Sequence, residues 1–195
     1  TEIKEFTYKH FIDSIALEKS VKDLGSKNYN IADMGTGAGF PGIPLAIVYP
    51  NLNLTLIDSL NKRIKFIKET CEILDIKNVN AIHSRAEDID RNKDYREKFD
   101  ICVSRAVANL ASLSEYCLPL VKIGGSFVSY KSKGYEAEMA EAQKAIKVLG
   151  GETGNIEKFE LGEYGERILL DIKKIKSTPD KYPRKAGLPT KEPIK

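Results

Sequence analysis

The sequence predicts an α/β, Rossmann-like fold in which a seven-stranded, mostly parallel sheet has helices on both faces and an antiparallel hairpin at its C-terminal end. Three observations predict it. Strand-like apolar runs alternate with helix-like runs, a glycine-rich turn follows the first strand-like run, and the last two strand candidates have no helix between them. Strands that alternate with helices form parallel sheets because each helix carries the chain back to the same edge.

The alternation consists of five strand candidates, each followed by a helix or, once, by a polar stretch. The strand candidates are residues 30–34, 52–58, 79–83, 99–104 and 126–131, and the helices are residues 42–49, 60–76, 110–121 and 135–149. Two helices have apolar residues at alternating steps of four and three, which places them on one face. These residues are Leu60, Ile64, Ile67, Cys71 and Leu74 in one helix and Tyr135, Met139, Ala142, Ile146 and Leu149 in the other.

Two further strand candidates, residues 156–161 and 167–175, are joined by the turn Gly162-Glu-Tyr-Gly165. A tight turn between strands gives an antiparallel pair. We expect one domain over residues 1–195, with a helical lead-in (1–29), a core (30–175) and a basic, proline-rich tail (176–195). Four prolines between residues 179 and 193 indicate that the tail is either a fixed extended arm or flexible.

The composition is that of a globular protein, with 42% hydrophobic and 30% charged residues. No apolar run approaches the length of a bilayer-spanning helix, and the first eleven residues do not resemble a signal peptide. Cys71, Cys102 and Cys117 are odd in number and widely spaced, which favours reduced core thiols over disulfides or a zinc site. We therefore expect a cytoplasmic protein with no membrane segment and no bound metal.

The net charge of +3 is unevenly distributed along the chain. Residues 171–195 contain eight Lys and Arg against three Asp and Glu, whereas residues 1–170 contain 23 against 25. Such a basic segment can bind the phosphates of a polyanion without reading its bases. On charge alone, a solvated charged terminus is an equal alternative.

The glycine-rich turn in residues 31–42 is the strongest functional signal. Asp33 stands two positions before Gly35, the first of three glycines. Gly35, Gly37 and Gly39 let the backbone turn sharply and approach a ligand. A dinucleotide fingerprint, G-x-G-x-x-G, needs glycine where Phe40 stands, which argues against a nicotinamide-dependent dehydrogenase. The pattern and the predicted sheet favour S-adenosylmethionine (SAM) and a class I SAM-dependent methyltransferase, with Asp33 binding the cofactor's ammonium group directly or through water.

In such a sheet the ligand lies outside the carboxyl ends of the strands, so the residues that follow each strand are the candidates. Asp58 ends the second strand, where a carboxylate can accept both ribose hydroxyls; the alternative is a helix N-cap. After the third strand, a backbone amide at Ala86 or Glu87 and the Glu87 carboxylate can meet the adenine edge. Arg105 ends the fourth strand, where it either holds a phosphate or base edge or pairs with Asp100 or a helix end.

Several motifs occur in a fixed order along the chain. They are His10-Phe-Ile-Asp-Ser14, Asp33-x-Gly-Thr-Gly-Ala-Gly-Phe-Pro-Gly-Ile-Pro-Leu-Ala-Ile47, Asp58-Ser-x-x-Lys-Arg63, Arg85-Ala-Glu87, Ser104-Arg-Ala-Val107 and Tyr182-Pro-Arg-Lys-Ala-Gly-Leu-Pro189. With these motifs the sequence resembles the glucose-inhibited division protein B family over almost its whole length. That family consists of bacterial SAM-dependent methyltransferases that act on guanine N7 of small-subunit (16S) ribosomal RNA. The resemblance implies this activity, with the RNA or the ribosomal subunit as partner; we also expect a monomer.

The resemblance implies cofactor contacts at Gly35, Phe40, Ala86, Glu87 and Arg105, whereas Asp33, Gly37, Gly39 and Asp58 rest on the loop and strand-end reasoning. Family members usually have a helical segment of a few dozen residues before the His-x-x-Asp-Ser motif, at which this sequence almost begins. We expect RNA docking to depend on such a segment more than cofactor binding does. His10 and Asp13 share a helix face, where they either shape the pocket or form a local pair.

Guanine N7 carries a free lone pair, so its methylation requires positioning of the base and no general base. We assign to Arg105 and Lys131 the catalytic role of orienting the RNA phosphates or the guanine, with Arg184 and Lys185 of the tail as a clamp. Two alternatives stay open. One is a SAM-dependent methyltransferase with a small-molecule substrate, and the other is a protein that binds SAM and RNA without turnover.

Overall fold

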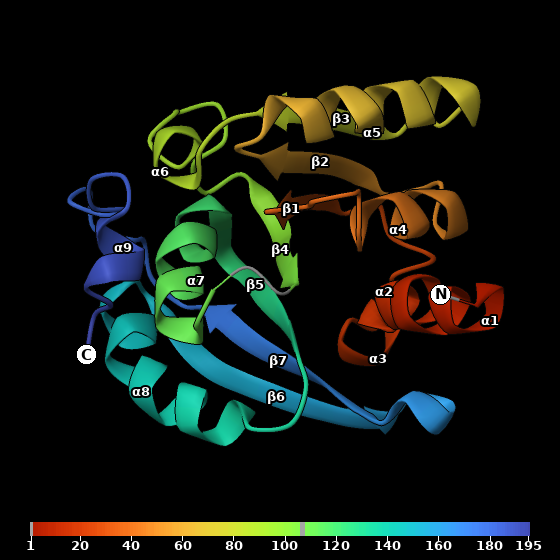
Figure 1. Ribbon diagram of the computed structural model, residues 1–195. Coiled ribbons are helices and arrows are strands. Elements are labelled where there is room, and N and C mark those ends of the chain that lie inside the picture. The colour runs from red at the N-terminus through yellow and green to blue at the C-terminus, as the bar shows by residue number, and fades with distance from the viewer. Residues whose placement is uncertain (1, 106–107) are drawn as a thin grey trace.

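The computed structural model describes residues 2–105 and 108–195, so Ala106 and Val107 of the fourth-strand motif lie outside the described residues. These residues form a seven-stranded sheet with the order β3-β2-β1-β4-β5-β7-β6 (Figure 1). The strands are β1 (Asn30–Met34), β2 (Asn53–Asp58), β3 (Val79–His83), β4 (Phe99–Arg105), β5 (Val121–Lys131), β6 (Gly151–Glu160) and β7 (Glu166–Lys174). The first five strands pair in parallel, and β7 pairs antiparallel with both β5 and β6. The predicted fold class is confirmed.

Helices cover both faces of the sheet (Figure 1). One face carries α4 (Gly42–Val48), α5 (Asn61–Ile73) and the N-terminal turns α1 (Ile3–Phe6), η1 (Thr7–Ile12), α2 (Asp13–Ile15) and α3 (Leu17–Ser20). The other carries α6 (Ala86–Ile89), α7 (Leu110–Cys117) and α8 (Tyr135–Val148), with η2 (Leu118–Leu120) and α9 (Leu188–Lys191) as short turns. The turn η3 (Gly162–Tyr164) joins β6 to β7 and lies beside the N-terminal turns, where the ring centroids of Tyr8 and Tyr164 are 5.5 Å apart. Within the described part of the chain, no helix is long and apolar enough to span a bilayer.

The core consists of two apolar clusters, one on each face of the sheet. Successive residues of a strand point to opposite faces, so Ile31 lies in the cluster under α4 and α5, whereas Ala32 lies in the cluster under α7 and α8. All three cysteines are free, and Cys102 and Cys117 are buried in the second cluster. Burial on both faces explains why the central strands are mostly apolar and do not alternate apolar with polar residues.

Several element boundaries differ from the prediction. The predicted helix 110–121 ends at Cys117, because Pro119 stands in the 3₁₀ turn that follows. Strand β5 already begins at Val121 and β6 at Gly151, five residues earlier than predicted in each case. In β5 the two glycines at 124–125 interrupt the alternation that Val121 and Ile123 begin, and the added residues of β6 are glycine or polar, so neither segment has a continuous period-2 apolar pattern.

The C-terminal residues lie against the core. The Arg184 guanidinium and backbone amide both donate hydrogen bonds to the buried Glu115 carboxylate of α7. The Gly187 amide donates to Glu87 Oε1 in α6 at 2.9 Å. These are the contacts of a fixed arm, the first of the two alternatives for the tail.

Candidate active site

The loop between β1 and α4 needs glycine at two positions for different reasons. Gly37 has φ +63°, and a Cβ there would have no heavy atom within 4 Å, so its backbone faces open space. Gly39 has φ +95°, and its Cβ would lie 2.5 Å from Ile43 Cδ1. The first glycine therefore leaves room beside the loop, and the second allows the loop to pack on the start of α4.

Asp33 lies beneath this loop and is fully buried. Its Oδ2 accepts hydrogen bonds from Thr36 Oγ1 at 2.6 Å and from the Gly42 amide at 2.9 Å, while Oδ1 has no partner among the described residues. Burial raises the pKa of Asp33 to about 6, although the hydrogen bonds from Thr36 and Gly42 oppose that shift. Asp33 lines neither of the two cavities beside the loop. Its carboxylate therefore stabilises the conformation of the loop.

The raised pKa of Asp33 predicts a pH dependence of stability. An unfolded Asp33 would titrate near 3.8 and the folded one near 6, so between these values the folded state binds the extra proton. The free energy of unfolding should therefore fall as the pH rises from 4 to 7, by about 2 to 3 kcal/mol relative to Asp33→Asn. Urea unfolding at several pH values measures this difference. Asp75→Asn, at an exposed position, is the control, and equal pH slopes for the protein and Asp33→Asn would contradict the prediction.

Asp58 ends β2 and holds the loop from the other side. Its Oδ2 accepts hydrogen bonds from the Gly37 amide at 3.0 Å and from Arg63 Nη1 at 3.1 Å, and its Oδ1 accepts from the Leu60 amide at 2.9 Å. The N-cap of α5 is Leu60, so Asp58 fixes the turn before the helix instead of capping it. The carboxylate is buried, yet it lines the cavities on both sides of the loop.

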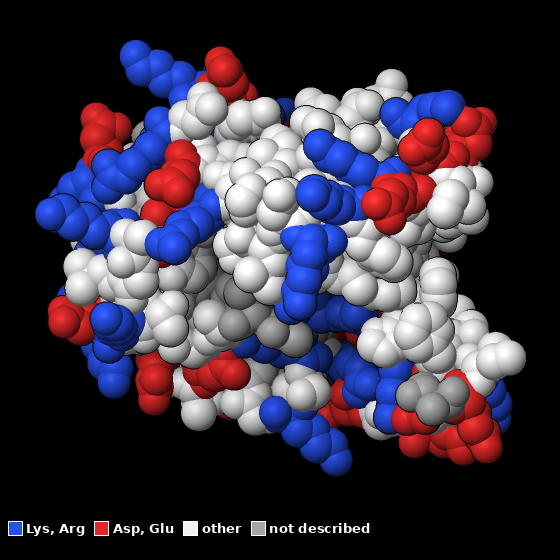
Figure 2. Space-filling view, turned by 45° about the horizontal axis from the view of Figure 1, so that its top comes forward, with Lys and Arg blue, Asp and Glu red and all other residues white. Residues whose placement is uncertain are grey.

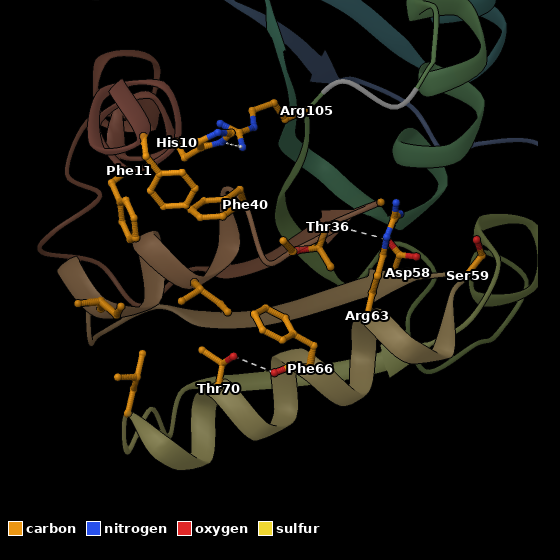
Figure 3. A pocket seen from close by; sticks show the side chains of 17 residues that line it. His10, Phe11, Thr36, Phe40, Asp58, Ser59, Arg63, Phe66, Thr70 and Arg105 are labelled. Atoms are coloured by element: carbon orange, nitrogen blue, oxygen red, sulfur yellow. Dashed lines mark hydrogen bonds and ion pairs between the residues drawn. The ribbon is translucent and has the colours of Figure 1, made fainter. Parts of the chain in front are cut away.

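Two cavities meet at Gly35, Asp58 and Ser59. The larger, about 760 Å³, also touches Gly37, Phe40 and Arg105 and extends between α4 and α5 along Phe66 and Thr70 (Figure 3). The smaller, about 370 Å³, is lined by residues that follow three strands, including Ser84, Ala86 and Glu87, and by Tyr116 of α7. Most of the predicted cofactor residues thus line one continuous region, while Asp33 and Gly39 lie below it.

Arg105 is surrounded by residues of the N-terminal helix. Its Nη1 donates to Asp13 Oδ2 at 2.9 Å and to the Lys9 carbonyl at 3.2 Å, and its Nη2 lies 3.3 Å from His10 Nδ1. Figure 3 shows the guanidinium beside His10 and the Phe40 ring, whose centroid is 5.4 Å away. Burial and the nearby guanidinium lower the pKa of His10. The two residues predicted to share a helix face therefore both contact Arg105.

One alternative for Arg105 is absent from the structure, and one candidate contact of Glu87 is restricted by it. Asp100 does not pair with Arg105; it accepts from the Asn30 amide and pairs with Lys122. Asp100 and Arg105 lie at opposite ends of β4, and five residues of extended strand keep their side chains too far apart for an ion pair. Glu87 lines the smaller cavity, but one of its oxygens is occupied by the Gly187 amide, so this carboxylate is only partly available to an adenine edge.

Lys131, the last residue of β5, lies near Arg105. Its ammonium donates to Glu138 Oε2 at 2.5 Å and to the Ala108 carbonyl at 3.3 Å. Lys131 and Arg105 line a third cavity, of about 360 Å³, together with Asp13, Tyr130, Ser132 and Arg167. Arg184 forms an ion pair with the buried Glu115, so its guanidinium is held against α7; a role in clamping RNA stays a prediction. Lys185 next to it is exposed.

Some residues of the site were not selected from the sequence. Arg63 stands in a quoted motif and contacts Asp58, so its motif was the available signal. Thr36 holds Asp33, and Tyr116 enters the smaller cavity from α7, which no pattern indicated. Among residues 2–105 and 108–195 there is no group of three or more His, Cys, Asp or Glu side chains that could hold a metal ion.

Comparison with known proteins identifies the family. A family model described as GidB, rRNA small subunit methyltransferase G, matches residues 1–168. The chain belongs to this family. A ribosomal RNA small subunit methyltransferase G of Desulforamulus reducens is 51% identical over 99% of this chain and 80% of its own length. The protein of the same name from Lachnoclostridium phytofermentans is 52% identical over 100% of this chain and 80% of its own length.

Solved structures share the fold at lower identity. A SAM-dependent O-methyltransferase of Thermotoga maritima matches with a TM-score of 0.61 and 14% identity over 86% of this chain and 67% of its own. TYW2 of M. jannaschii in complex with AdoMet matches with a TM-score of 0.62 and 16% identity over 84% and 77%. As a member of the GidB family, the chain is a SAM-dependent methyltransferase.

The residues of the site fit SAM. Asp58 presents a carboxylate to both cavities, as a ribose diol requires, and the open space beside Gly37 admits a ligand against the backbone. The larger cavity has aromatic walls at Phe6, Phe11 and Phe40, which suit the apolar carbons beside a sulfonium, a cation that also favours the faces of aromatic rings. The donors and acceptors present thus match the cofactor that the family uses.

Proposed function

We propose that this protein transfers the methyl group of SAM to N7 of a guanine in small-subunit ribosomal RNA. One observation carries the proposal. Arg105 lies in the wall between the cavity at the glycine loop and a cavity lined by Lys131 and Arg167, so a cofactor site adjoins a site that attracts anions. The family membership of the chain and the names of its relatives support the same substrate class.

We assign the cofactor contacts as follows. Asp58 accepts the ribose hydroxyls, and the backbone at Gly35 and Gly37 lies against the ligand. The amides at Ala86 and Glu87 lie at the smaller cavity, where the adenine binds. Phe40 and Arg105 bound the larger cavity at the reactive end. Asp33 and Gly39 act through the shape of the loop.

The chemistry explains why the site needs no base. When bound, SAM supplies an electrophilic methyl group on a sulfonium. Guanine N7 has a free lone pair in the major groove, so no side chain has to remove a proton. The residues of this chain then act by holding the base in line and by excluding water, and such positioning can lower a barrier by roughly 7 to 11 kcal/mol in ideal cases. The target base must be unstacked or already exposed to enter the site.

The surface supports contact with a polyanion only in part. On the left of Figure 2, the side on which Figure 1 places the C-terminal residues, Lys and Arg side chains are frequent and are interspersed with Asp and Glu. Exposed lysines of this segment, such as Lys181 and Lys185, can add phosphate contacts that read no sequence. We propose that the chain works in the cytoplasm as a single-domain monomer without a metal ion.

Transfer of labelled methyl from SAM tests the proposal. Unmodified bacterial small-subunit RNA and assembled subunits are the acceptors, and digestion to nucleosides identifies the methylated atom. We expect label in 7-methylguanosine at a single position. Label in no RNA, despite measurable SAM binding, would contradict the proposal and favour a small-molecule acceptor or a protein that binds SAM and RNA without turnover.

A further inference from the structure

The third cavity, lined by Asp13, Arg105, Tyr130, Lys131, Ser132 and Arg167, is the strongest feature that the cofactor site does not use. We propose that it is the subsite for an RNA phosphate next to the target guanine, and that Arg167 is the residue that contacts this phosphate. This inference rests on the proposed function. It adds Arg167, which no sequence pattern indicated, to Arg105 and Lys131, and it commits these cations to a phosphate as their ligand.

The register of the sheet brings Arg167 to this cavity. Arg105 of β4 pairs with Tyr130 of β5, and Tyr130 pairs with Leu169 of β7. Paired residues share a face of the sheet, and residues two apart in a strand share it too, so Arg167 lies on the same face as Arg105. Because β7 runs antiparallel, its first residues lie at the edge where β4 and β5 end. An arginine 62 positions away in the sequence thereby comes beside Arg105.

One carboxylate holds the two guanidinium groups together. Asp13 Oδ2 accepts from Arg105 Nη1 at 2.9 Å, and Asp13 Oδ1 lies 3.4 Å from Arg167 Nε. Lys131 is the third cation of the cavity, and its partner Glu138 is the second carboxylate. Three positive side chains against two negative ones leave an excess of one positive charge. Since like charges at this spacing repel one another, an added anion lowers the electrostatic energy of the cluster.

Donors remain for such an anion. The described contacts of Arg167 use Nε, toward Asp13, and Nη1, toward the carbonyls of Tyr164 and Glu166. Among the described residues, no hydrogen bond from Arg167 Nη2 or Arg105 Nε is present. The two side chains are 21% and 16% exposed, so they are fixed in place and still reach the cavity. A guanidinium held in this way is well suited to a phosphate.

The reaction itself favours a phosphate over the base as the ligand of these arginines. An arginine that reads guanine donates to O6 and N7 together. N7 is the atom that must attack the methyl group, and a hydrogen bond to its lone pair would block the reaction. The cations beside the cofactor cavity therefore serve the reaction when they bind the backbone of the RNA and leave N7 free.

Arg167→Ala tests the inference, with Lys158→Ala as the matched control. Lys158 lies in β6 of the same hairpin, is 48% exposed and does not line the cavity. We expect Arg167→Ala to raise the KM for small-subunit RNA about 10- to 100-fold and to reduce the slope of log KM against log salt by about one. Lys158→Ala should change neither quantity, and the Kd for SAM, measured by calorimetry, should stay the same in both variants.

A purely structural role predicts a different pattern. If Arg167 only anchors Asp13, Arg167→Ala would lower the free energy of unfolding and weaken SAM binding while the salt slope stayed unchanged, which would overturn the inference. Arg167→Lys, which keeps the charge, should restore most of the RNA affinity. Unchanged KM and salt slope in Arg167→Ala would overturn the inference and leave the proposed function standing. No methyl transfer to RNA by the unaltered protein would overturn both.

Discussion

Replacing Asp58 with alanine should weaken SAM binding about 100-fold. The carboxylate is only 3% exposed and lines both cavities at the glycine loop, where we place the ribose. Among the described residues, Oδ1 has only the Leu60 amide as partner and can accept one more bond, and a hydrogen bond to a charged group contributes about 1.5 to 3 kcal/mol. Loss of this ribose contact together with the loop contacts accounts for a 100-fold change, which corresponds to about 2.7 kcal/mol. Calorimetric titration of SAM into the variant measures the effect.

Part of that loss would arise through the loop, because Asp58 also holds the amides of Gly37 and Leu60. Asp58→Asn separates the two contributions: it keeps the shape and one acceptor oxygen, so its SAM affinity should lie between those of the protein and Asp58→Ala. Asp75→Ala, at an exposed position beyond the end of α5, should bind SAM normally. Unchanged SAM affinity in Asp58→Ala would remove Asp58 from the cofactor site.

The architecture could be predicted because the information is local. Each central strand is an apolar run of the right length, and each is followed by a helix with apolar residues on one face or by a short polar stretch. The turn at residues 162–165 was sufficient to indicate the antiparallel pair. The errors occurred where β5 and β6 begin, at Val121 and Gly151, because glycines interrupt the apolar alternation in β5 and the edge strand β6 begins with glycine and polar residues.

The position of the site followed from the topology, but the contacts within it did not. Residues that end neighbouring parallel strands must meet, and Asp58, Ala86 and Arg105 do lie around the same pair of cavities or in their walls. Asp33 was assigned to the ligand from its spacing to the glycines. The same spacing also suits a carboxylate that holds the loop by hydrogen bonds, and the sequence does not distinguish the two roles. The structure favours support, since Thr36 and Gly42 occupy one oxygen of a fully buried carboxylate.

The remaining contacts join distant parts of the chain, which local patterns cannot indicate. Asp13 meets Arg105 and Arg167, which lie 92 and 154 positions away in the sequence. The tail was predicted as a basic segment from its charge alone, and its arginine instead forms an ion pair with Glu115 that is 69 positions distant. Charge counts along a sequence do not distinguish a solvent-exposed cationic side chain from one that pairs with a buried carboxylate.

Replacing Arg184 with alanine should lower the free energy of unfolding by about 3 to 5 kcal/mol, because the substitution leaves an unpaired carboxylate in the interior. Glu115 has a side chain that is 1% exposed, and the Arg184 side chain satisfies both of its oxygens at 2.8 to 3.1 Å. Urea unfolding monitored by circular dichroism measures the change. Lys185→Ala removes an exposed cation from the next position and should change the free energy of unfolding by less than about 0.5 kcal/mol.

Arg184→Ala should also weaken SAM binding. The tail donates the Gly187 amide to Glu87 and places Thr190 Oγ1 2.9 Å from the Tyr116 hydroxyl, and both Glu87 and Tyr116 line the smaller cavity. A tail released from Glu115 would loosen both contacts, so we expect Arg184→Ala to raise the Kd for SAM a few-fold. The double variant Glu115→Leu/Arg184→Met removes the buried charge together with its partner. This double variant should recover most of the stability, although the hydrogen bond from the backbone amide of residue 184 to Glu115 stays lost. If the Kd for SAM stays raised in the double variant, the loss of the tail's attachment, and not the unpaired charge of Glu115, weakens SAM binding.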